Sequence, residues 1–303
     1  MGEMLIPVVN QIAMLFIVAA VGLMLRKKGV FTDQVIKGVN TTVINVTWPC
    51  MAVMALLVDY TPEVLDGFLK VMLISIVAMS ASCVIGYLVF NRCKDKLRRP
   101  VYICLGALPN AGFVGMPIAH ALFGEIGVLY MAAFLVGFNL LVWTAGASMY
   151  TGFGIKTLKG FLSPGCIGIV IGIALFILKI HLPEPINLAI TSIGRLNTPL
   201  AMLLMGARMD TLKLSDLADK KMWGATALKL LGMPLLVFAV MKLMGFSGIL
   251  LTLPVMMIAM PAASVCQMLA ERHGGDSKYA ATGVSLSTLM CIVTVPLLAF
   301  IIG

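Results

Sequence analysis

Charged residues are scarce in this chain of 303 residues. Only 12% of them are charged, whereas 60% are hydrophobic, and a soluble domain carries about twice that share of charge. The mean hydropathy is +1.04. A soluble globule of this size needs a larger polar surface than this composition supplies. The composition therefore excludes a soluble enzyme, a nucleic-acid-binding protein and a disordered chain.

Recognisable catalytic and metal-binding patterns are also missing. The seven cysteines are scattered and form no Cys-x-x-Cys pair, which argues against a disulfide framework and against a metal site. The zinc-protease, nucleophile-elbow and phosphate-loop motifs do not occur. No aspartate or glutamate falls at mid-depth of an apolar run, so no carboxylate relay for protons or sodium is visible. We therefore expect no enzyme activity, no cofactor, no metal ion and no ATP-driven pumping by this chain alone.

Long hydrophobic runs are what the chain has in abundance. A helix needs about 20 apolar residues to cross the hydrocarbon core of a bilayer. The connections between the runs are short, and the ten-residue alternating segments of a β-barrel are absent. The pattern predicts an all-α integral membrane protein with ten transmembrane helices, at residues 4–25, 38–58, 67–90, 100–122, 126–150, 161–180, 186–207, 222–244, 248–270 and 278–302.

Basic residues indicate the orientation in the membrane. Seventeen of the 22 lysines and arginines fall in the connections after the odd-numbered runs, and only Lys70, Lys179 and Lys242 lie on the opposite side. Because positively charged loops stay in the cytoplasm, we expect a multi-pass protein of the inner (plasma) membrane with both termini outside the cytoplasm. The first run carries Glu3 and no basic residue at its front end, so it is not predicted to be a cleaved signal peptide.

The two halves of the chain share three landmarks at a nearly constant offset. The matched positions are Pro49 and Pro199, Pro109 and Pro261, and Gly124-Glu125 and Gly275-Asp276, with offsets of 150, 152 and 151. A repeated unit of five spans enters the membrane from opposite sides in its two copies, because five is odd. The offset thus predicts two inverted five-helix repeats, an architecture common among secondary transporters. The repeats would be residues 1–150 and 164–303, joined by a cytoplasmic linker at 151–163.

Proline and glycine interrupt the fourth and ninth runs. Residues 109–117 read PNAGFVGMP, and the ninth run carries PAAS at 261–264. Proline removes a backbone donor, and bare backbone survives in hydrocarbon only where protein or a water-filled cavity covers it. An ordinary proline kink explains either break alone, but matched breaks in both halves favour two unwound helices that cross at the midplane. Each restarting half-helix brings free N–H groups and about half a positive charge to this point, which predicts an anion site.

The fourth run also resembles a known family signature. Residues 109–117 look like the N-x-G-F-x-G-x-P motif of bacterial proteins of the auxin efflux carrier family, which are relatives of the plant PIN-FORMED auxin transporters. Residues 198–206, TPLAMLLMG, are similar to that family's seventh span, and the resemblance extends over the whole chain in span number, order and length. It implies scaffold helices 1, 2, 6 and 7, and mobile transport helices 3–5 and 8–10 in which helices 4 and 9 cross. It also implies a homodimer through the scaffold, and substrates that carry a carboxylate, such as auxin, malate or malonate.

The resemblance implies that Pro109, Asn110 and Pro261 lie at the crossing. In the ninth run, small residues stand where the family has an amide immediately after the proline. Ser264 or Gln267 is the expected substitute for that amide. The long cytoplasmic loop of the plant members is missing, so regulation through such a loop is not expected.

Polar residues within the runs complete the candidate site. Asn110 is the best single candidate, because its amide can donate either to a carboxylate or to loose carbonyl groups. Arg195, near the centre of the seventh run, needs a partner, which is either the substrate or a helix end or lipid phosphate. The other polar candidates also fit ordinary hydrogen bonds between helices. The full set is Pro109, Asn110, Gly112, Gly115, Asn139, Arg195, Asn197, Pro261, Ser264 and Gln267.

Two further polar features lie within apolar runs. Lys229 is about two turns from the cytoplasmic end of the eighth run, where a lysine is expected to extend its ammonium group to the interface. The second run is unusually polar, which indicates a face toward a cavity or a helix interface. Its polar residues are Asn40, Thr41, Thr42, Asn45 and Thr47.

These patterns support functions of three different classes. The leading one is a secondary carrier of small organic anions that works by alternating access at the crossing of helices 4 and 9. The alternative is a membrane sensor that binds a carboxylate ligand without moving it, but the short connections between the runs lead us to expect no signalling domain. An intramembrane enzyme lacks a nucleophile–base set. Export of one anion down a potential of about 100 mV releases about 2.3 kcal/mol, which supports a gradient of roughly fifty-fold, whereas uptake of a dicarboxylate needs a coupling cation.

Overall fold

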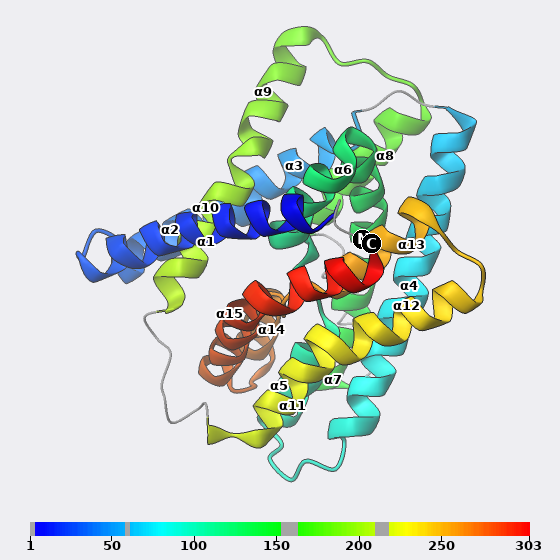
Figure 1. Cartoon of the computed structure of the whole chain (residues 1–303). Helices are drawn as coiled ribbons and strands as arrows, with labels where there is room; N and C mark the ends of the chain where they lie inside the picture. Colours follow the sequence, from blue (N-terminus) through cyan, green and yellow to red (C-terminus); the bar gives the residue numbers. More distant parts are fainter. Residues whose placement is uncertain (1–3, 58–60, 153–162, 210–217) are drawn as a thin grey trace.

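The computed structural model describes residues 4–57, 61–152, 163–209 and 218–303 (Figure 1). Throughout these ranges the regular elements are helices, as the apolar runs predict, and the sole extended feature is a single β-bridge. The first half contains α1 (Leu5–Lys27), α2 (Asp33–Thr42), α3 (Trp48–Met54), α4 (Pro62–Phe90), α5 (Arg99–Ala107), α6 (Met116–Leu141) and α7 (Ala147–Thr151). The second half contains α8 (Pro164–Ile177), α9 (Glu184–Arg195), α10 (Asn197–Arg208), α11 (Lys220–Ala227), α12 (Met233–Leu243), α13 (Gly248–Ile258), α14 (Val265–His273) and α15 (Ser277–Ile302). Among the described residues, four π-helical turns connect neighbouring helices: η1 (Val43–Thr47), η2 (Ala111–Gly115), η3 (Val142–Gly146) and η7 (Leu228–Gly232).

Six helices are long and apolar enough to cross a membrane, counted over the described residues. They are Leu5–Lys27, Pro62–Phe90, Ala111–Thr151, Glu184–Arg208, Lys220–Leu243 and Ser277–Ile302, and Pro164–Ile177 and Gly248–Ile258 are shorter apolar helices. The chain is therefore an integral membrane protein of helical type.

Local interruptions explain why the continuous helices are fewer than the ten apolar runs. The fourth and ninth runs are each divided in the middle, between α5 and η2 and between α13 and α14. The later part of the fourth run then continues into the fifth as one helical stretch, Ala111–Thr151. This stretch is kinked at Gly124, where φ is +59°. Glycine adopts this left-handed conformation at little cost, and Gly124 lies where the apolar pattern separates the two runs.

Short polar side chains and prolines determine where several helices begin. The side chains of Thr61, Ser163 and Asp276 accept hydrogen bonds from the backbone amides of Val64, Cys166 and Tyr279. Each bond satisfies one of the amides that a helix leaves without an internal partner at its start. Proline follows Thr61 and Ser163 directly, where its missing N–H costs nothing.

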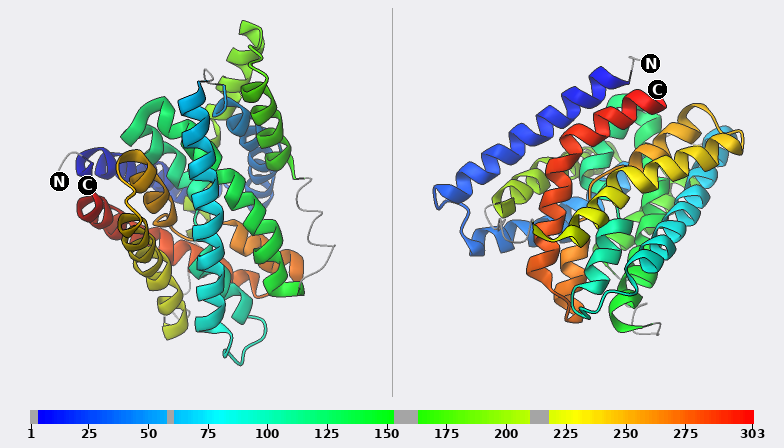
Figure 2. Two further views of the ribbon diagram at one scale, coloured as in Figure 1. Left: turned by 90° about the vertical axis from the view of Figure 1, so that its right-hand side faces the viewer. Right: turned by 60° about the horizontal axis from the view of Figure 1, so that its bottom comes forward.

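The helices pack into two groups. In the first group, α1 packs on α10, and α3 packs on α8 and α9. In the second group, α4 packs on α5, α6 and α13, and α14 packs on α15. Contacts of α1 with α6 and α15 connect the groups. As a result, α1 and α15 lie side by side, and the two ends of the chain are neighbours in every view (Figures 1 and 2).

Helices α1 and α10 approach so closely that they leave no room for side chains at two positions. A Cβ atom at Gly206 would lie 1.8 Å from the carbonyl oxygen of Ala19, and one at Gly22 would lie 2.0 Å from that of Leu203. In a membrane, such small residues allow backbones to pack directly against each other. Glycine at these two positions thus holds the first group of helices together.

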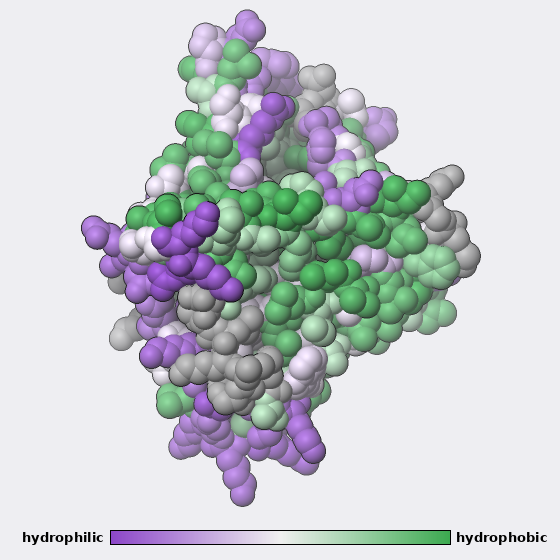
Figure 3. All heavy atoms as spheres, turned by 60° about the vertical axis from the view of Figure 1, so that its left-hand side comes forward, coloured by the Kyte–Doolittle hydropathy of each residue, from purple (hydrophilic) through white to green (hydrophobic). Residues whose placement is uncertain are grey.

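The surface carries hydrophobic residues over a broad field that is bounded by hydrophilic residues at the upper and lower ends of the view (Figure 3). Large apolar side chains are exposed on several helices, among them Leu73, Val170, Leu243 and Val293. Lipid covers such side chains in a membrane protein. The distribution agrees with the six apolar helices.

A polar network connects three helix starts at one end of the second group. The carboxylate of Asp219, which caps α11, accepts hydrogen bonds from the hydroxyls of Tyr102 on α5 and Tyr279 on α15. The guanidinium of Arg98 lies 4.1 Å from the ring centre of Tyr279 and donates to Asp276 at 3.2 Å. Burial by itself raises the pKa of Asp219, but the hydrogen bonds from the two tyrosines outweigh it and hold this pKa below its usual value.

Candidate functional site at the paired helix breaks

The two interrupted helices meet at their interruptions. Pro109 and Ala262 form an antiparallel β-bridge. The amide of Asn110 donates to the carbonyl oxygen of Pro261 at 2.6 Å, and the amide of Ala263 donates to that of Leu108 at 2.9 Å. All of these residues are buried. The fourth and ninth runs therefore cross in the interior at their prolines.

The crossing solves the problem that proline creates in each helix. Proline cannot donate to the preceding turn, and an unpaired backbone group in a membrane costs several kcal/mol. Here each break supplies hydrogen-bonding partners to the other. The hydroxyl of Ser287 on α15 additionally accepts from the amide of Ala262 at 3.0 Å. The crossing is thus a paired and supported structure rather than two independent kinks.

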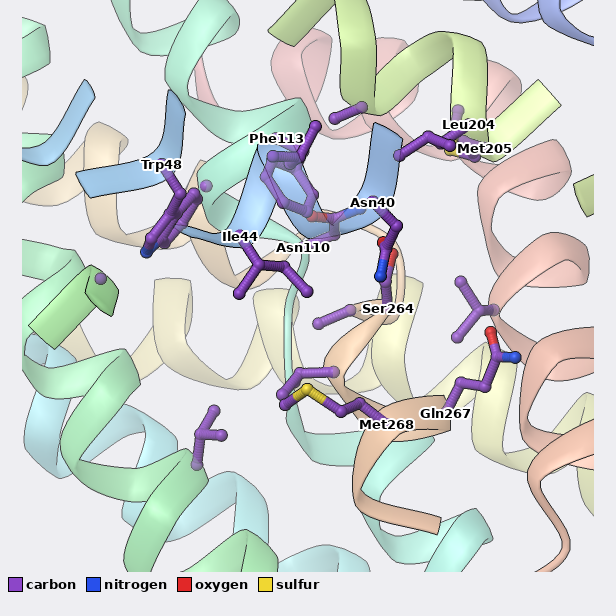
Figure 4. Close-up of a pocket in the computed structure, with 18 of the residues that line it drawn as sticks. Asn40, Ile44, Trp48, Asn110, Phe113, Leu204, Met205, Ser264, Gln267 and Met268 are labelled. Atoms are coloured by element: carbon purple, nitrogen blue, oxygen red, sulfur yellow. The ribbon is translucent and has the colours of Figure 1, made fainter. Parts of the chain in front are cut away.

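A cavity of about 230 Å³ lies beside the crossing, which we call the crossing cavity (Figure 4). Its walls come from both groups of helices: η1, α3 and α10 on one side, and η2, α14 and α15 on the other. The rings of Trp48 and Phe113 meet edge to face with centroids 5.1 Å apart. The lining is mostly apolar with a few convergent polar groups, which is typical of a site for a small organic molecule.

Five of the ten predicted site residues line the crossing cavity. They are Asn110, Gly112, Asn139, Ser264 and Gln267. Asn110 and Ser264 face this space from the two broken helices, and Gln267 follows one turn later on α14 (Figure 4). The amide nitrogen of Asn139 already donates to the carbonyl oxygen of Leu135 at 2.8 Å, as expected of an ordinary polar residue in a helix.

Three predicted site residues belong to the crossing itself or to its packing. Pro109 and Pro261 form part of the bridged segments and do not line the cavity. Gly115 faces α13, where a Cβ atom would lie 2.7 Å from the sulfur of Met257. These three residues shape the site through the backbone.

Asn197 and Arg195 lie away from the crossing cavity. Asn197 is fully buried, where its side-chain oxygen accepts from the hydroxyl of Thr47 at 2.9 Å and its nitrogen lies 3.2 Å from the sulfur of Met51. It therefore connects α10 to η1 and α3, the interhelical use that its residue type also allows. Arg195 lines a second cavity of about 500 Å³ with His120 and Glu125, which we call the second cavity.

On three different elements, a residue that lines the crossing cavity lies only one helical turn from a residue that lines the second cavity. On α3, Trp48 lines the crossing cavity and Met51 lines the second one. On the broken fourth run, Phe113 and Met116 divide in the same way, and on α10 the corresponding residues are Met205 and Met202. Since one turn of helix is about 5.4 Å long, the barrier between the cavities is thin.

Sequence reasoning did not predict four polar residues of the crossing cavity, Ser163, Arg208, Glu271 and Ser285. The guanidinium of Arg208 donates at 3.2 Å to the side-chain oxygen of Asn40, which also lines the cavity. Arg208 was counted only as a basic residue of a connection. The sequence does contain a signal for Arg208. Leu204 and Met205 lie three and four positions after Ala201, and Arg208 lies four and three positions after them, so all four residues share one face of α10. The polar second run was expected to face a cavity or an interface, and Asn40 and Thr47 do so.

The expectation that Lys229 extends to the interface is wrong. Lys229 is fully buried, and its ammonium group donates to the carbonyl oxygen of Ile258 at 2.8 Å. Ile258 is the last residue of α13, where a helix leaves carbonyl groups without internal partners. The side chain therefore turns inward to the ninth run, because a helix end there offers it an acceptor.

The N-terminal ends of η2 and α14 both lie at the crossing cavity. A helix leaves its first N–H groups without partners inside the helix, and its dipole favours negative charge at that end. Gly112 and Phe113 of η2 and Ser264 and Val265 at the start of α14 line the cavity. Gly112 is packed against Trp48, where a Cβ atom would lie 2.0 Å from the indole ring. Such an arrangement can hold a carboxylate.

The fold defines a helical membrane protein that has a mostly apolar cavity with a few polar groups beside two paired helix breaks. The family model described as membrane transport protein matches residues 7–159 and 153–299. The chain belongs to this family, that of the auxin efflux carriers, as the motif at 109–117 indicates. It is therefore a multi-pass membrane transporter.

Two archaeal proteins are similar to the chain over nearly its whole length. One is an uncharacterized transporter of Methanothermobacter thermautotrophicus, 23% identical over 293 residues, which are 93% of this chain and 94% of the relative. The other is an uncharacterized transporter of Methanocaldococcus jannaschii, 22% identical over 310 residues, which are 97% of this chain and 98% of the relative. The similarity thus extends through both broken helices.

Proposed function

We propose that the protein is a secondary carrier of small organic anions that binds a carboxylate in the crossing cavity. The observation that carries the proposal is the pairing of two helix breaks beside this cavity, through Asn110 to Pro261 and Ala263 to Leu108. Both restarting helices, η2–α6 and α14, begin at the cavity. Their free amides and helix dipoles favour an anion, so no positively charged side chain needs to contact the substrate directly.

The substrate carboxylate accepts hydrogen bonds from the first amides of η2 and from the side chain of Asn110. Ser264 and Gln267 provide donors from the opposite helix, in the place of the amide that this chain lacks after Pro261. The apolar part of the substrate packs against the contacting rings of Trp48 and Phe113. Arg208 attracts the anion at the end of the cavity.

Movement of the substrate follows from the thin barrier between the two cavities. The second group of helices, which holds the crossing, slides or rocks against the first group, which holds α1, α3 and α8–α10. A shift by about one helical turn transfers the crossing from the crossing cavity to the second cavity. Gln11, His120, Asn187, Thr191 and Arg195 supply a polar lining on that side.

In this proposal the chain has ten spans arranged as two inverted units of five, residues 1–150 and 164–303. The first group corresponds to scaffold spans 1, 2, 6 and 7, and the second group to transport spans 3–5 and 8–10. Most of the linker at 151–163 lies outside the described residues. The crossing cavity faces the cytoplasm, since Arg208 and Glu271 adjoin the basic connections, and the scaffold forms the homodimer.

Counterflow in proteoliposomes tests the proposal. Purified protein is reconstituted, the vesicles are loaded with an unlabelled carboxylate, and uptake of the same labelled compound is followed. A thermal-shift screen of mono- and dicarboxylates selects the compound, because a ligand that binds the folded state raises the melting temperature. The proposal predicts transient accumulation of label above equilibrium. Binding without counterflow would instead identify a sensor. If no carboxylate showed either binding or counterflow, the proposed anion site would be refuted.

A further inference from the structure

A buried lysine, Lys229, lies behind the crossing and does not line the crossing cavity. Lys229 lies on η7 and is fully buried. Its ammonium group donates to the carbonyl oxygen of Ile258, and the ionisable groups that interact with it are the thiols of Cys83 and Cys266. Within the described ranges no carboxylate pairs with it. A buried cation without an anionic partner is costly and needs a reason.

The reason lies in the four helix ends that meet at the crossing. Helices α5 and α13 end there, whereas η2 and α14 begin there. Each beginning carries about half a positive charge and each end about half a negative charge, so the four ends together are nearly neutral. A cation at the carbonyl end of α13 changes this balance, because it cancels the negative end that would otherwise repel an anion. The same carbonyl end favours the charged form of the lysine, whereas burial of the side chain opposes it.

Only the second half of the chain has this charge. Met79 stands 150 positions before Lys229, the offset that also separates Pro49 from Pro199. Met79 is fully buried on α4 and carries no charge. The carbonyl group of Leu108, near the end of α5, is instead occupied by the amide of Ala263. The lysine therefore lies behind one of the two helix ends only, and the crossing has no symmetrical pair of lysines.

We propose that Lys229 is the fixed charge that makes the crossing selective for anions and that neutralises a bound monocarboxylate while the transport helices move. This proposal rests on the carrier function proposed above. The segment η7 packs against α5, α11, α12 and α15, all in the group that holds the crossing. The charge therefore moves with the site. The loaded carrier crosses the membrane field as a neutral unit, and the empty carrier returns with one positive charge.

The proposal predicts that the membrane potential affects the rate of net efflux but not the rate of exchange. Exchange of inside for outside substrate uses only the loaded carrier, so voltage does not affect its rate. Net efflux includes the return of the empty, positively charged carrier, which an inside-negative potential accelerates. Replacement of Lys229 by glutamine keeps a donor for the carbonyl of Ile258 but removes the charge. The loaded carrier then moves with one negative charge, and exchange becomes voltage-dependent.

The experiment measures exchange of labelled indole-3-acetate, a monocarboxylate, in proteoliposomes with equal concentrations on both sides. A potassium gradient with valinomycin sets the potential to zero or to about 100 mV. We expect the same exchange rate at both potentials for the wild type and for Lys229→Arg. For Lys229→Gln we expect exchange to slow by roughly fivefold at the higher potential, because one full charge then crosses the field. Lys242→Gln is the matched control, since Lys242 is exposed on the same transmembrane segment, and it should behave as the wild type.

Three results would overturn the inference. Wild-type exchange that slows several-fold at the higher potential would show that the loaded carrier is not neutral, and this arm decides even if Lys229→Gln fails to fold. Folded Lys229→Gln with voltage-independent exchange would show that Lys229 does not balance the substrate. Folded wild type without any exchange of indole-3-acetate would refute the carrier function for this monocarboxylate, and the inference with it.

Discussion

The backbone amide of Asn110 donates to the carbonyl oxygen of Pro261 at 2.6 Å and joins two proline-interrupted helices from opposite halves of the chain. This bond gives the Asn110 backbone a partner within the protein and leaves its side chain at the crossing cavity. The same residue thus closes the break and faces the site. The backbone of Asn110 stabilises the break, whereas its side chain faces the cavity. A substitution of the side chain therefore tests binding while it keeps the backbone bond.

Asn110→Ala removes the side-chain amide but keeps the backbone bond to Pro261. We expect carboxylate binding to weaken about tenfold or more, because a hydrogen bond to a charged group contributes about 1.5–3 kcal/mol. The melting temperature without ligand should change little. Binding is measured by thermal shift against carboxylate concentration, with Asn10→Ala on the exposed face of α1 as control. Unchanged affinity in the Asn110 variant would remove this residue from the site.

Ser287→Ala tests the support of the crossing. It removes the acceptor of the Ala262 amide and leaves a buried donor without its partner. The free energy of unfolding should fall by about 1–3 kcal/mol, measured by thermal denaturation in detergent. Thr294→Ala on the same helix is the control, since Thr294 is half-buried and its hydroxyl donates to the carbonyl oxygen of Met290 within its own helix, away from the crossing. Equal stability of the two variants would contradict a supporting role for Ser287.

Gly206→Ala tests the close approach of α1 and α10. The added methyl group collides with the carbonyl oxygen of Ala19, so the helices must separate. We expect a loss of about 1–3 kcal/mol in the free energy of unfolding. Gly224→Ala has open space around the new Cβ atom, and it should stabilise the helix slightly, by about 0.5–1 kcal/mol. If both substitutions had the same sign, the interface between α1 and α10 would not be as close as described.

Asp219→Asn tests the network of Tyr102, Tyr279 and Asp219. Because the pKa of Asp219 is lower in the folded protein than in the unfolded chain, its carboxylate contributes stability above the unfolded-state value, about pH 4. This contribution disappears as the pH falls through the lower folded-state value. The wild type should therefore melt above the variant at neutral pH, and the difference should shrink in acid. A difference that is independent of pH would exclude the charge of Asp219 as its cause, and the exposed Asp66→Asn serves as control.

Much of the fold follows from elementary features of the sequence. Apolar runs predict the helices, and proline and glycine at 109–117 and at 261–264 predict where two of them are interrupted. The matched breaks also predict that these helices meet. The bridge between Pro109 and Ala262 confirms this contact, because each break supplies hydrogen-bonding partners to the backbone of the other.

The site was less accessible to sequence reasoning. Residue type and position identified Asn110 and Gln267 as candidates, and the structure places both at the crossing cavity. The same reasoning did not find the inward direction of Lys229, since that depends on the carbonyl of Ile258, which is nearby only in the folded protein. Arg208 was overlooked because a charge count treats a residue at a helix end as part of the adjoining connection. Three-dimensional packing decided all of these cases.

Access to the two cavities from opposite sides of the membrane is the most direct test of the account. Cysteine is introduced at Gln267 in the crossing cavity or at Thr191 in the second cavity, in a background without the native cysteines, and intact vesicles are treated with a membrane-impermeant thiol reagent. We predict that position 267 reacts only from the cytoplasmic side and position 191 only from the other side, and that a transported carboxylate changes the two rates in opposite directions. Reaction of both positions from one side, or rates that no carried substrate alters, would contradict alternating access at the crossing.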